Sequence, residues 1–387
     1  MSTRSGAHSV RSARYEGLVQ KQIFSMPSYT TIGGKTIKDL KVGWESYGNL
    51  NDAKDNVVLV PHFYSANSHV AGKYKEDDLL PGYWDSIIGP GKAIDTDRFF
   101  VISVDSLVNM NSKDGITVTT GPASINPDTG KPYGMSFPIV TIRDFVRVQK
   151  ALLDSLGIKK LVAAGGVSMG GMQSYEWAAA YPEMVERVFA VNSTSSQQPS
   201  ARVVLEAWVA PIKVDPKWNK GNYYDGPEPI DGLTTALYNV TVDALHHESI
   251  TDTFGYQWAD PNKDPLESLE NDFLSVQSIK AMSLLRATTA VDANNMLYMT
   301  RANQLFVAGT AGSSVESQLK NIKVKVLVIQ ARTDLLFAPE YAKAEVVQLK
   351  KNGTHAEFVE FDSGGGHLSG ITEVAKAGDA IRKFLTT

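Results

Sequence analysis

The sequence predicts an α/β protein with a mostly parallel sheet, helices on both faces of that sheet and a helical lid insertion. In the first half, short apolar runs alternate with polar turns and helical segments, as they do in βα units. The same pattern returns near the carboxyl terminus, after a long stretch in which strand-like runs are few. With 387 residues, the chain can form one large domain with an insertion or two modest domains.

The elements follow from runs of apolar residues and their periodicity. The helix expected at Thr141–Leu156 has apolar residues at helical spacing and stops at Gly157, a common helix terminator. A second helix is expected at Met172–Ala180 and a closing helix at Val374–Phe384. Strands are expected at Val57–Pro61, Phe99–Val104, Lys160–Ala164, Val185–Val191, Val324–Gln330 and Glu357–Phe361.

Residues 196–317 differ from the segments on either side. Aromatic and polar residues mix there with helical stretches at Gly232–Leu245 and Val291–Phe306. We expect residues 16–195 and 318–387 to form the α/β core and residues 196–317 to form the lid; the alternative is a separate second domain. Residues 1–15 carry arginines and serines with no apolar stretch behind them, which favours a flexible tail over a transit-like segment and excludes a secretory signal.

Composition excludes several classes of protein. Lys and Arg total 38 against 42 for Asp and Glu, so the net charge of −4 gives no basic surface for nucleic acid. The chain has no cysteine, which excludes disulfides, zinc–thiolate sites, iron–sulfur clusters and a cysteine nucleophile. No apolar run approaches the roughly 18 residues that span a bilayer. We therefore expect a cytoplasmic protein with neither a membrane nor a nucleic acid as partner.

Residues 166–170 read Gly-Val-Ser-Met-Gly, a GxSxG segment between a predicted strand and a predicted helix. A nucleophile elbow needs this context, because small residues let the chain turn sharply and present the serine hydroxyl above the sheet edge. The alternative is a glycine-rich turn with an idle serine. We expect Ser168 to be a nucleophile.

A serine hydroxyl needs a base to take its proton, and the resulting imidazolium needs a carboxylate to orient it. Behind a nucleophile elbow the chain order is serine, acid, histidine. Asp334 and His367 follow the two strands expected after the insertion, at the sheet edge where α/β proteins place their sites. We predict that they act with Ser168, and Asp362 is the reserve acid.

Two backbone N–H groups are expected to stabilise an oxyanion. Met169 lies at a helix N-terminus, and Tyr64 lies in the loop after the first strand, with Phe63 in reserve. His62 and His69 flank this loop and are interpreted as packing residues, since no third metal ligand is evident. Neither a GxGxxG run nor a GxxxxGK[ST] loop occurs, so we expect no cofactor and no metal.

Seven stretches of the chain resemble the homoserine O-acetyltransferase family of α/β-hydrolase proteins, and the similarity covers most of the chain. They are SHVAGKY (68–74), GPGKAIDTDRFFVI (89–102), TGPASINPDTGKPYG (120–134), FPIVTIRDFVRVQK (137–150), GGVSMGGMQSYEWA (165–178), DANNMLYMTRA (292–302) and DLLFAPE (334–340). The resemblance implies an α/β-hydrolase fold, a Ser168/Asp334/His367 triad and ping-pong chemistry through an acyl-enzyme. It also implies a homodimer formed through the lid helices.

The acceptor pocket departs from the family pattern. In the family, an arginine on a lid helix meets the homoserine carboxylate, a tyrosine about two turns later assists it, and an aspartate directly after the catalytic histidine meets the ammonium. Here Leu237, Ala244 and Leu368 stand in those places. The segment FYSAN (63–67) also replaces the usual leucine-threonine-glycine-aspartate run. Burying a zwitterion without counter-charges costs several kcal/mol per ion, and about 1.4 kcal/mol is tenfold in affinity.

The sequence therefore favours a serine carboxylesterase that hydrolyses short-chain, in the first place acetyl, esters of simple alcohols. The alternative is an acyl-CoA-dependent O-acetyltransferase, acting on homoserine or a related acceptor, with acetyl-CoA as co-substrate. The two differ only in what attacks the acyl-enzyme. A third hypothesis, a non-catalytic binding protein, is disfavoured because serine, acid and histidine all stand in the expected order.

Overall fold

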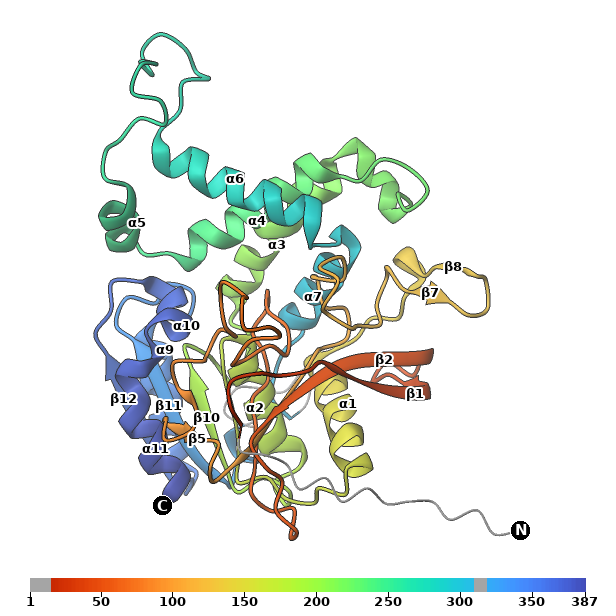
Figure 1. Cartoon of the computed structure of the whole chain (residues 1–387), viewed down its shortest axis with the longest axis vertical. Helices are drawn as coiled ribbons and strands as arrows, with labels where there is room; N and C mark the ends of the chain where they lie inside the picture. The colour runs from red at the N-terminus through yellow and green to blue at the C-terminus, as the bar shows by residue number, and fades with distance from the viewer. Residues whose placement is uncertain (1–14, 310–318) are drawn as a thin grey trace.

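A computed structural model of the chain describes residues 15–309 and 319–387 and shows one eight-stranded sheet (Figure 1). The strand order is β1-β2-β6-β3-β9-β10-β11-β12; β1 and β2 are antiparallel to their neighbours, and the strands from β6 to β12 are parallel. The strands are β1 (Gln22–Thr30), β2 (Thr36–Tyr47), β3 (Val57–Leu59), β6 (Phe100–Val104), β9 (Ala163–Val167), β10 (Arg187–Val191), β11 (Lys325–Ala331) and β12 (Ala356–Phe361). Two short ribbons pair β4 (Ile88–Gly89) with β5 (Ile94–Asp95) and β7 (Ile125–Asn126) with β8 (Lys131–Pro132).

Each face of the sheet packs against its own apolar cluster. Successive residues of a strand point to opposite faces, so they contribute to the two clusters in turn. In β3, Val57 and Leu59 join one apolar cluster and Val58 joins the other. In β11, Val326 and Val328 join the first cluster, whereas Leu327, Ile329 and Ala331 join the second. This alternation explains why the parallel strands read as nearly continuous apolar runs in the sequence.

The helices around the core begin and end where capping predicts. The Thr141 hydroxyl accepts from the Asp144 N–H, and the Asp144 carboxylate accepts from the Thr141 N–H, so α1 starts with a capping box. Gly157 follows α1 with φ 76°, the left-handed conformation of a helix terminator. The helices of the core are α1 (Ile142–Ser155), α2 (Met169–Ala180), α9 (Pro339–Lys351), α10 (Ser369–Thr372) and α11 (Gly378–Thr386), with short 3₁₀ turns η1 (Gly134–Ser136), η3 (Gly366–Leu368) and η4 (Val374–Ala377).

The insertion is helical and lies over the carboxyl ends of the parallel strands, at the top of Figure 1. Helix α4 packs between α3 and α6, and α7 continues from this layer down to the core, where it packs beside α3. These elements are α3 (Pro199–Val214), η2 (Pro216–Gly221), α4 (Ile230–Ala244), α5 (His247–Phe254), α6 (Leu274–Thr289) and α7 (Ala293–Gln304). Among the described residues, no helix combines the length and the apolar character that crossing a bilayer requires.

The α/β class and the mostly parallel sheet are confirmed, with two differences. The strand expected at 160–164 lies at Ala163–Val167, because pairing with β3 and β10 outweighs the weak strand preference of its alanines and glycines. The hairpin of β1 and β2 was not predicted. The many exposed residues of β1 and its Pro27 are typical of a strand at the edge of a sheet. The expected tail falls almost entirely outside the described residues, and the division at 195/196 and 317/318 stays a prediction.

Candidate active site

Ser168 joins β9 to α2 in a strained turn. Its φ of 55° and ψ of −123° lie in a region that non-glycine residues rarely adopt. Space beside it is limited, since a Cβ added at Gly166 or at Gly170 would lie 2.6 Å or 2.3 Å from the Pro61 carbonyl oxygen. The two glycines of the GxSxG segment are therefore required sterically, and the turn presents Ser168 at the N-terminus of α2.

The side chains of Ser168, His367 and Asp334 form a hydrogen-bonded line. Ser168 Oγ lies 2.8 Å from His367 Nε2, and Asp334 Oδ2 lies 2.9 Å from His367 Nδ1. Because a carboxylate only accepts, Nδ1 carries the proton and Nε2 accepts from the serine hydroxyl. Asp334 is 1% exposed and His367 7% exposed. The structure thus brings together the three residues predicted from chain order.

Asp334 is held in place by the backbone and by one side chain. The N–H groups of Leu336 and Phe337 donate to its Oδ1 at 2.9 and 3.0 Å, and Gln330 Nε2 donates to its Oδ2 at 3.0 Å. The reserve acid Asp362 points elsewhere: its Oδ1 pairs with Arg332 Nε at 2.7 Å on the surface, and this hydrogen bond lowers the pKa of Asp362. Asp334 is therefore the carboxylate that contacts His367.

The turn that carries His367 depends on one glycine. Gly366 has φ 69°, and a Cβ there would lie 2.6 Å from the backbone nitrogen of His246 in the lid. The Gly366 N–H donates to Thr333 Oγ1 at 3.0 Å, and Asn192 Nδ2 donates to the His367 carbonyl at 3.0 Å. These contacts hold the backbone of the turn from which the imidazole reaches Ser168.

The two predicted oxyanion donors flank the same cavity. Met169 is the first residue of α2, so its N–H has no acceptor within the helix and lies at the positive end of the helix dipole. Tyr64 follows β3 and lines the cavity beside Ser168, as does Phe63. Within residues 15–309 and 319–387, the backbone N–H groups of Phe63 and Tyr64 find no acceptor.

A cavity of about 180 Å³ opens between the core and the lid at Ser168. It is smaller than the 300–1,000 Å³ typical of sites for drug-sized ligands. Its lid wall includes Val204, Leu205, Trp208, Val240 and Ala244, together with Ser200 and Ala201, and its core wall includes Phe63, Phe337, Leu368 and Ile371. No Asp, Glu, Lys or Arg occurs among the described residues that line it.

Two of the three predicted pocket residues line this cavity, and one does not. Ala244 and Leu368 do; Leu368 directly follows His367 in η3. Leu237 does not line this cavity. It lies two turns before Ala244 in α4 and packs in the larger apolar cluster, while Val240 lines the cavity. Trp208, which the sequence left open between lining and packing, lines the cavity.

The histidines flanking the Tyr64 loop make hydrogen bonds within the core. His62 is fully buried and contacts backbone and amide groups, and His69 Nδ1 lies 2.9 Å from Glu45 Oε2. In the described part of the chain, no three His, Cys, Asp or Glu side chains are grouped so that they could hold a metal ion.

Sequence reasoning missed several polar residues of the site, including Ser65 and Ser200 in the cavity lining. Gln330 supports Asp334, and Gln197 and Asn303 line the cavity. Gln330 was detectable in the sequence, because it is the only polar residue of the apolar run VLVIQ. The structure shows that its side chain is fully buried, where a polar group needs hydrogen-bond partners. Gln197 and Asn303 reach the cavity from a loop and from α7, and only the tertiary arrangement shows this.

Comparison with known proteins agrees with this geometry. Residues 80–374 match the family model described as the alpha/beta hydrolase fold. The homoserine O-acetyltransferase of Methanococcoides burtonii is 40% identical over 354 residues, covering 92% of this chain and 71% of that protein. The homoserine O-acetyltransferase of Symbiobacterium thermophilum is 38% identical, covering 91% of this chain and 90% of that protein.

Solved structures extend the comparison. Esterase E22 is 49% identical with a TM-score of 0.90, covering 95% of this chain and all of that chain (100%). The homoserine O-acetyltransferase from Bacillus anthracis is 35% identical, also with a TM-score of 0.90, covering 96% of this chain and 98% of that chain. The predicted α/β-hydrolase fold and an enzyme of the hydrolase or acyltransferase kind are thereby confirmed. The chain therefore belongs to the homoserine O-acetyltransferase family of α/β-hydrolase-fold enzymes.

Proposed function

We propose that the protein is a serine carboxylesterase that hydrolyses short-chain, preferentially acetyl, esters of simple alcohols. The supporting observation is the apolar cavity at Ser168, whose described lining includes no Asp, Glu, Lys or Arg. An amino-acid acceptor would bring both a carboxylate and an ammonium into this cavity without counter-charges, at a cost of several kcal/mol per ion. An acetyl ester of an uncharged alcohol carries no such penalty.

In the proposed mechanism, Ser168 Oγ attacks the ester carbonyl carbon while its proton moves to His367 Nε2. Asp334 accepts the hydrogen bond from Nδ1 and stabilises the imidazolium. The Met169 and Tyr64 N–H groups stabilise the oxyanion of the tetrahedral intermediate. The carbon–oxygen bond to the alcohol then breaks, and the alcohol leaves with the proton from Nε2. A water molecule repeats the sequence on the acetyl-enzyme and releases acetate.

The alternative is O-acetyl transfer from acetyl-CoA to homoserine, and the names of the curated relatives favour it over hydrolysis. It uses the same acyl-enzyme and the same three residues, with the homoserine hydroxyl in the place of water. Among the solved structures, the neighbour at 49% identity is named an esterase and the one at 35% a homoserine O-acetyltransferase. Both reactions therefore enter the test.

The test compares p-nitrophenyl acetate, butyrate and octanoate with an acetyl-CoA plus homoserine assay on the same purified protein. We expect kcat/KM to fall as the acyl chain outgrows the small cavity, and acetyl-CoA consumption to stay at background with homoserine. Homoserine-dependent release of CoA at a rate above ester hydrolysis would overturn the esterase proposal in favour of the transferase.

For partners, we propose a small-molecule ester as substrate, no cofactor, and a homodimer formed through the lid helices in the cytoplasm. Supporting the dimer, α6 exposes Met282, Leu284 and Leu285, with 48%, 46% and 62% of their surface accessible. Leu285→Glu should convert the dimer into a monomer in sedimentation or light-scattering measurements. A wild-type protein that is monomeric at micromolar concentration would contradict this assembly.

A further inference from the structure

The His62 ring is buried and contacts its own loop and the segment that follows β6. Its Nδ1 lies 2.7 Å from the carbonyl oxygen of Phe63. Its Nε2 accepts from the Ser106 N–H at 3.0 Å and lies 3.3 Å from Asn109 Nδ2. None of these contacts involves Ser168, Asp334 or His367, so the mechanism above gives His62 no role.

The partners of His62 allow only one tautomer. A backbone N–H only donates, so Nε2 must offer its lone pair to Ser106; a carbonyl only accepts, so Nδ1 must carry the proton that Phe63 receives. Burial lowers the pKa of His62, and the Phe63 carbonyl opposes this more weakly. The ring is therefore neutral and acts as a fixed donor to the Phe63 carbonyl.

The orientation of the Phe63 carbonyl also sets the orientation of the Tyr64 N–H, because both belong to one peptide group. No cis peptide bond occurs in the described residues, and in a trans peptide the C=O and N–H bonds point in opposite directions. The Tyr64 N–H thus points away from the His62 ring. It has no acceptor in the described part of the chain, and Tyr64 shares a cavity with Ser168.

Other carbonyl groups of this loop are held in the same manner. Gln173 Nε2 donates to the His62 carbonyl at 3.0 Å, Asn111 Nδ2 to the Ser65 carbonyl at 3.0 Å and Asn109 Nδ2 to the Ala66 carbonyl at 2.9 Å. Side-chain amides of the core therefore bind the carbonyls on either side of the Phe63–Tyr64 peptide. At that peptide the imidazole is the side-chain donor, at 2.7 Å, and the Ala66 N–H also reaches the Phe63 carbonyl, at 3.1 Å.

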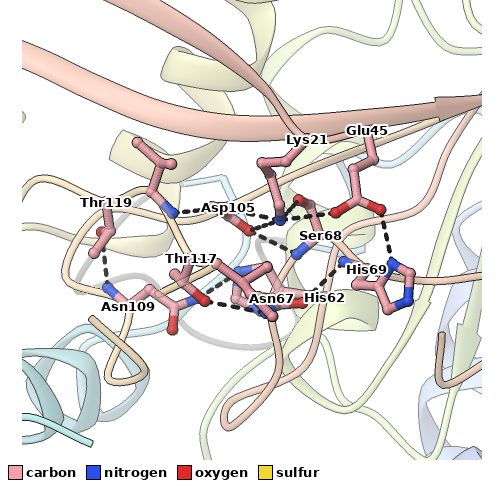
Figure 2. A network of polar contacts seen from close by, with 12 residues as sticks. Lys21, Glu45, His62, Asn67, Ser68, His69, Asp105, Asn109, Thr117 and Thr119 are labelled. Atoms are coloured by element: carbon pink, nitrogen blue, oxygen red, sulfur yellow. Dashed lines mark hydrogen bonds and ion pairs between the residues drawn. The ribbon is translucent and has the colours of Figure 1, made fainter. Parts of the chain in front are cut away.

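The far end of the loop is anchored by other residues, which Figure 2 shows beside His62. The Ser68 N–H donates to Asp105 Oδ1 at 2.6 Å, and Lys21 Nζ donates to Ser68 Oγ at 2.6 Å. Lys21 Nζ lies 2.9 Å from Glu45 Oε1, and His69 binds the other oxygen of this carboxylate. This charged cluster can keep the loop folded when the His62 ring is altered, so orientation and folding can be tested separately.

From these contacts we propose that His62 is a positioning residue, whose Nδ1–H holds the Phe63 carbonyl so that the Tyr64 N–H faces the oxyanion formed at Ser168. The inference rests on the proposed acyl-enzyme chemistry and adds to it the residue that orients one oxyanion donor. It predicts that His62 affects the tetrahedral intermediate and leaves the binding of the ground-state ester nearly unchanged.

The experiment measures His62→Ala, His62→Asn and a matched control, Tyr83→Phe, with p-nitrophenyl acetate and with a methyl trifluoromethyl ketone, whose hemiketal oxyanion mimics the intermediate. Removing an oxyanion donor costs about 10²- to 10³-fold in kcat, so misdirecting one should cost about 10- to 100-fold in His62→Ala. The Ki of the ketone should rise in proportion while KM changes little. His62→Asn, whose amide nitrogen can occupy the Nδ1 position, should restore most of the loss.

Tyr83→Phe removes a buried hydroxyl that has no hydrogen-bond partner among the described residues, on a ring 5.0 Å from that of Phe63, and should leave kcat unchanged. Wild-type kcat in a folded His62→Ala protein, or a fall in kcat with no change in Ki, would overturn the inference.

If His62→Ala does not fold, nitrogen-15 NMR of the wild-type histidines tests the inference through the protonation of the His62 ring. A His62 ring protonated on Nε2 near neutral pH contradicts the proposal, and a neutral ring protonated on Nδ1 supports it. Ester hydrolysis retained by Ser168→Ala would instead show that the proposed function itself is wrong.

Discussion

The two walls of the cavity at Ser168 differ in how their side chains are held. On the core wall, polar groups make specific hydrogen bonds: Asp334 accepts from two backbone N–H groups and from Gln330, and His367 links Asp334 to Ser168. On the lid wall, the lining residues of α3 and α4 are mostly apolar, and Trp208 turns its indole N–H to Asp243 at 2.6 Å.

This difference separates two questions about function. The core wall determines that an acyl group can be taken up, because nucleophile, base, acid and oxyanion donors require defined geometry. Under the proposed function, the apolar surfaces, including Leu368 beside His367, select what removes that acyl group, because an apolar wall disfavours a charged acceptor. Changes in the core wall should therefore abolish turnover, and changes in the apolar surfaces should redirect it.

Ser168→Ala should have the largest effect. Without the nucleophile, kcat for p-nitrophenyl acetate should fall by about 10⁴-fold or more, leaving only the residual catalysis of the oxyanion hole and binding. The measurement is steady-state hydrolysis together with labelling by a fluorophosphonate probe, which should be lost. A variant that hydrolyses the ester at near-native rate would remove the acyl-enzyme from the account.

Asp334→Asn should lower kcat by about 10⁴-fold, because the amide supports the wrong imidazole tautomer. The matched control is Asp362→Asn, which alters the other carboxylate near the turn but only breaks a surface pair with Arg332. We expect this control to stay within about twofold of wild type. The reverse order of the two effects would assign the acid to Asp362 and contradict the contacts of Asp334.

The core wall was predictable from the sequence and the lid wall only in part. The motif around Ser168 and the positions of Asp334 and His367 were readable from the sequence, because each residue lies directly after a parallel strand or in the turn that follows one. The position of Leu237 was not predictable, because helical spacing gives the face of α4 but not how far along the helix the cavity extends. Likewise, His62 has an informative environment only once β3 and β6 are paired.

Leu368→Asp tests the apolar surface with an effect of intermediate size. A carboxylate beside His367 is unfavourable for an apolar ester and favourable for an ammonium, so hydrolysis of p-nitrophenyl acetate should fall about tenfold while O-acetylhomoserine formation rises. Mass spectrometry of the products measures both. Leu368→Asn separates the effect of charge from that of shape, and equal behaviour of the two variants would show that charge does not select the acceptor.

The smallest effect on turnover is expected from Glu45, in the charged cluster behind the core wall. Burial raises its pKa, but hydrogen bonds from His69 and Tyr74 and the charge of Lys21 outweigh it and hold the pKa at about 2. Since the folded pKa lies below the usual value of about 4.5, Glu45 stabilises the fold above pH 4.5 and loses this contribution as the pH falls towards 2.

Glu45→Gln should therefore lower the unfolding free energy at pH 7 by a few kcal/mol and flatten its decline between pH 4.5 and 2. Urea unfolding at several pH values measures both changes, with kcat of the folded protein as the control. An unchanged acid limb would show that Glu45 does not couple to folding.

The fate of the acetyl group on Ser168 tests the central claim most directly. The protein is mixed with carbon-13-labelled acetyl ester and excess homoserine, and labelled acetate and O-acetylhomoserine are quantified after a single turnover. If the apolar cavity excludes the zwitterion as we propose, nearly all of the label should appear as acetate at every homoserine concentration. Label that moves into O-acetylhomoserine as homoserine rises would show that the cavity accepts the amino acid, and hydrolysis would no longer be the proposed function.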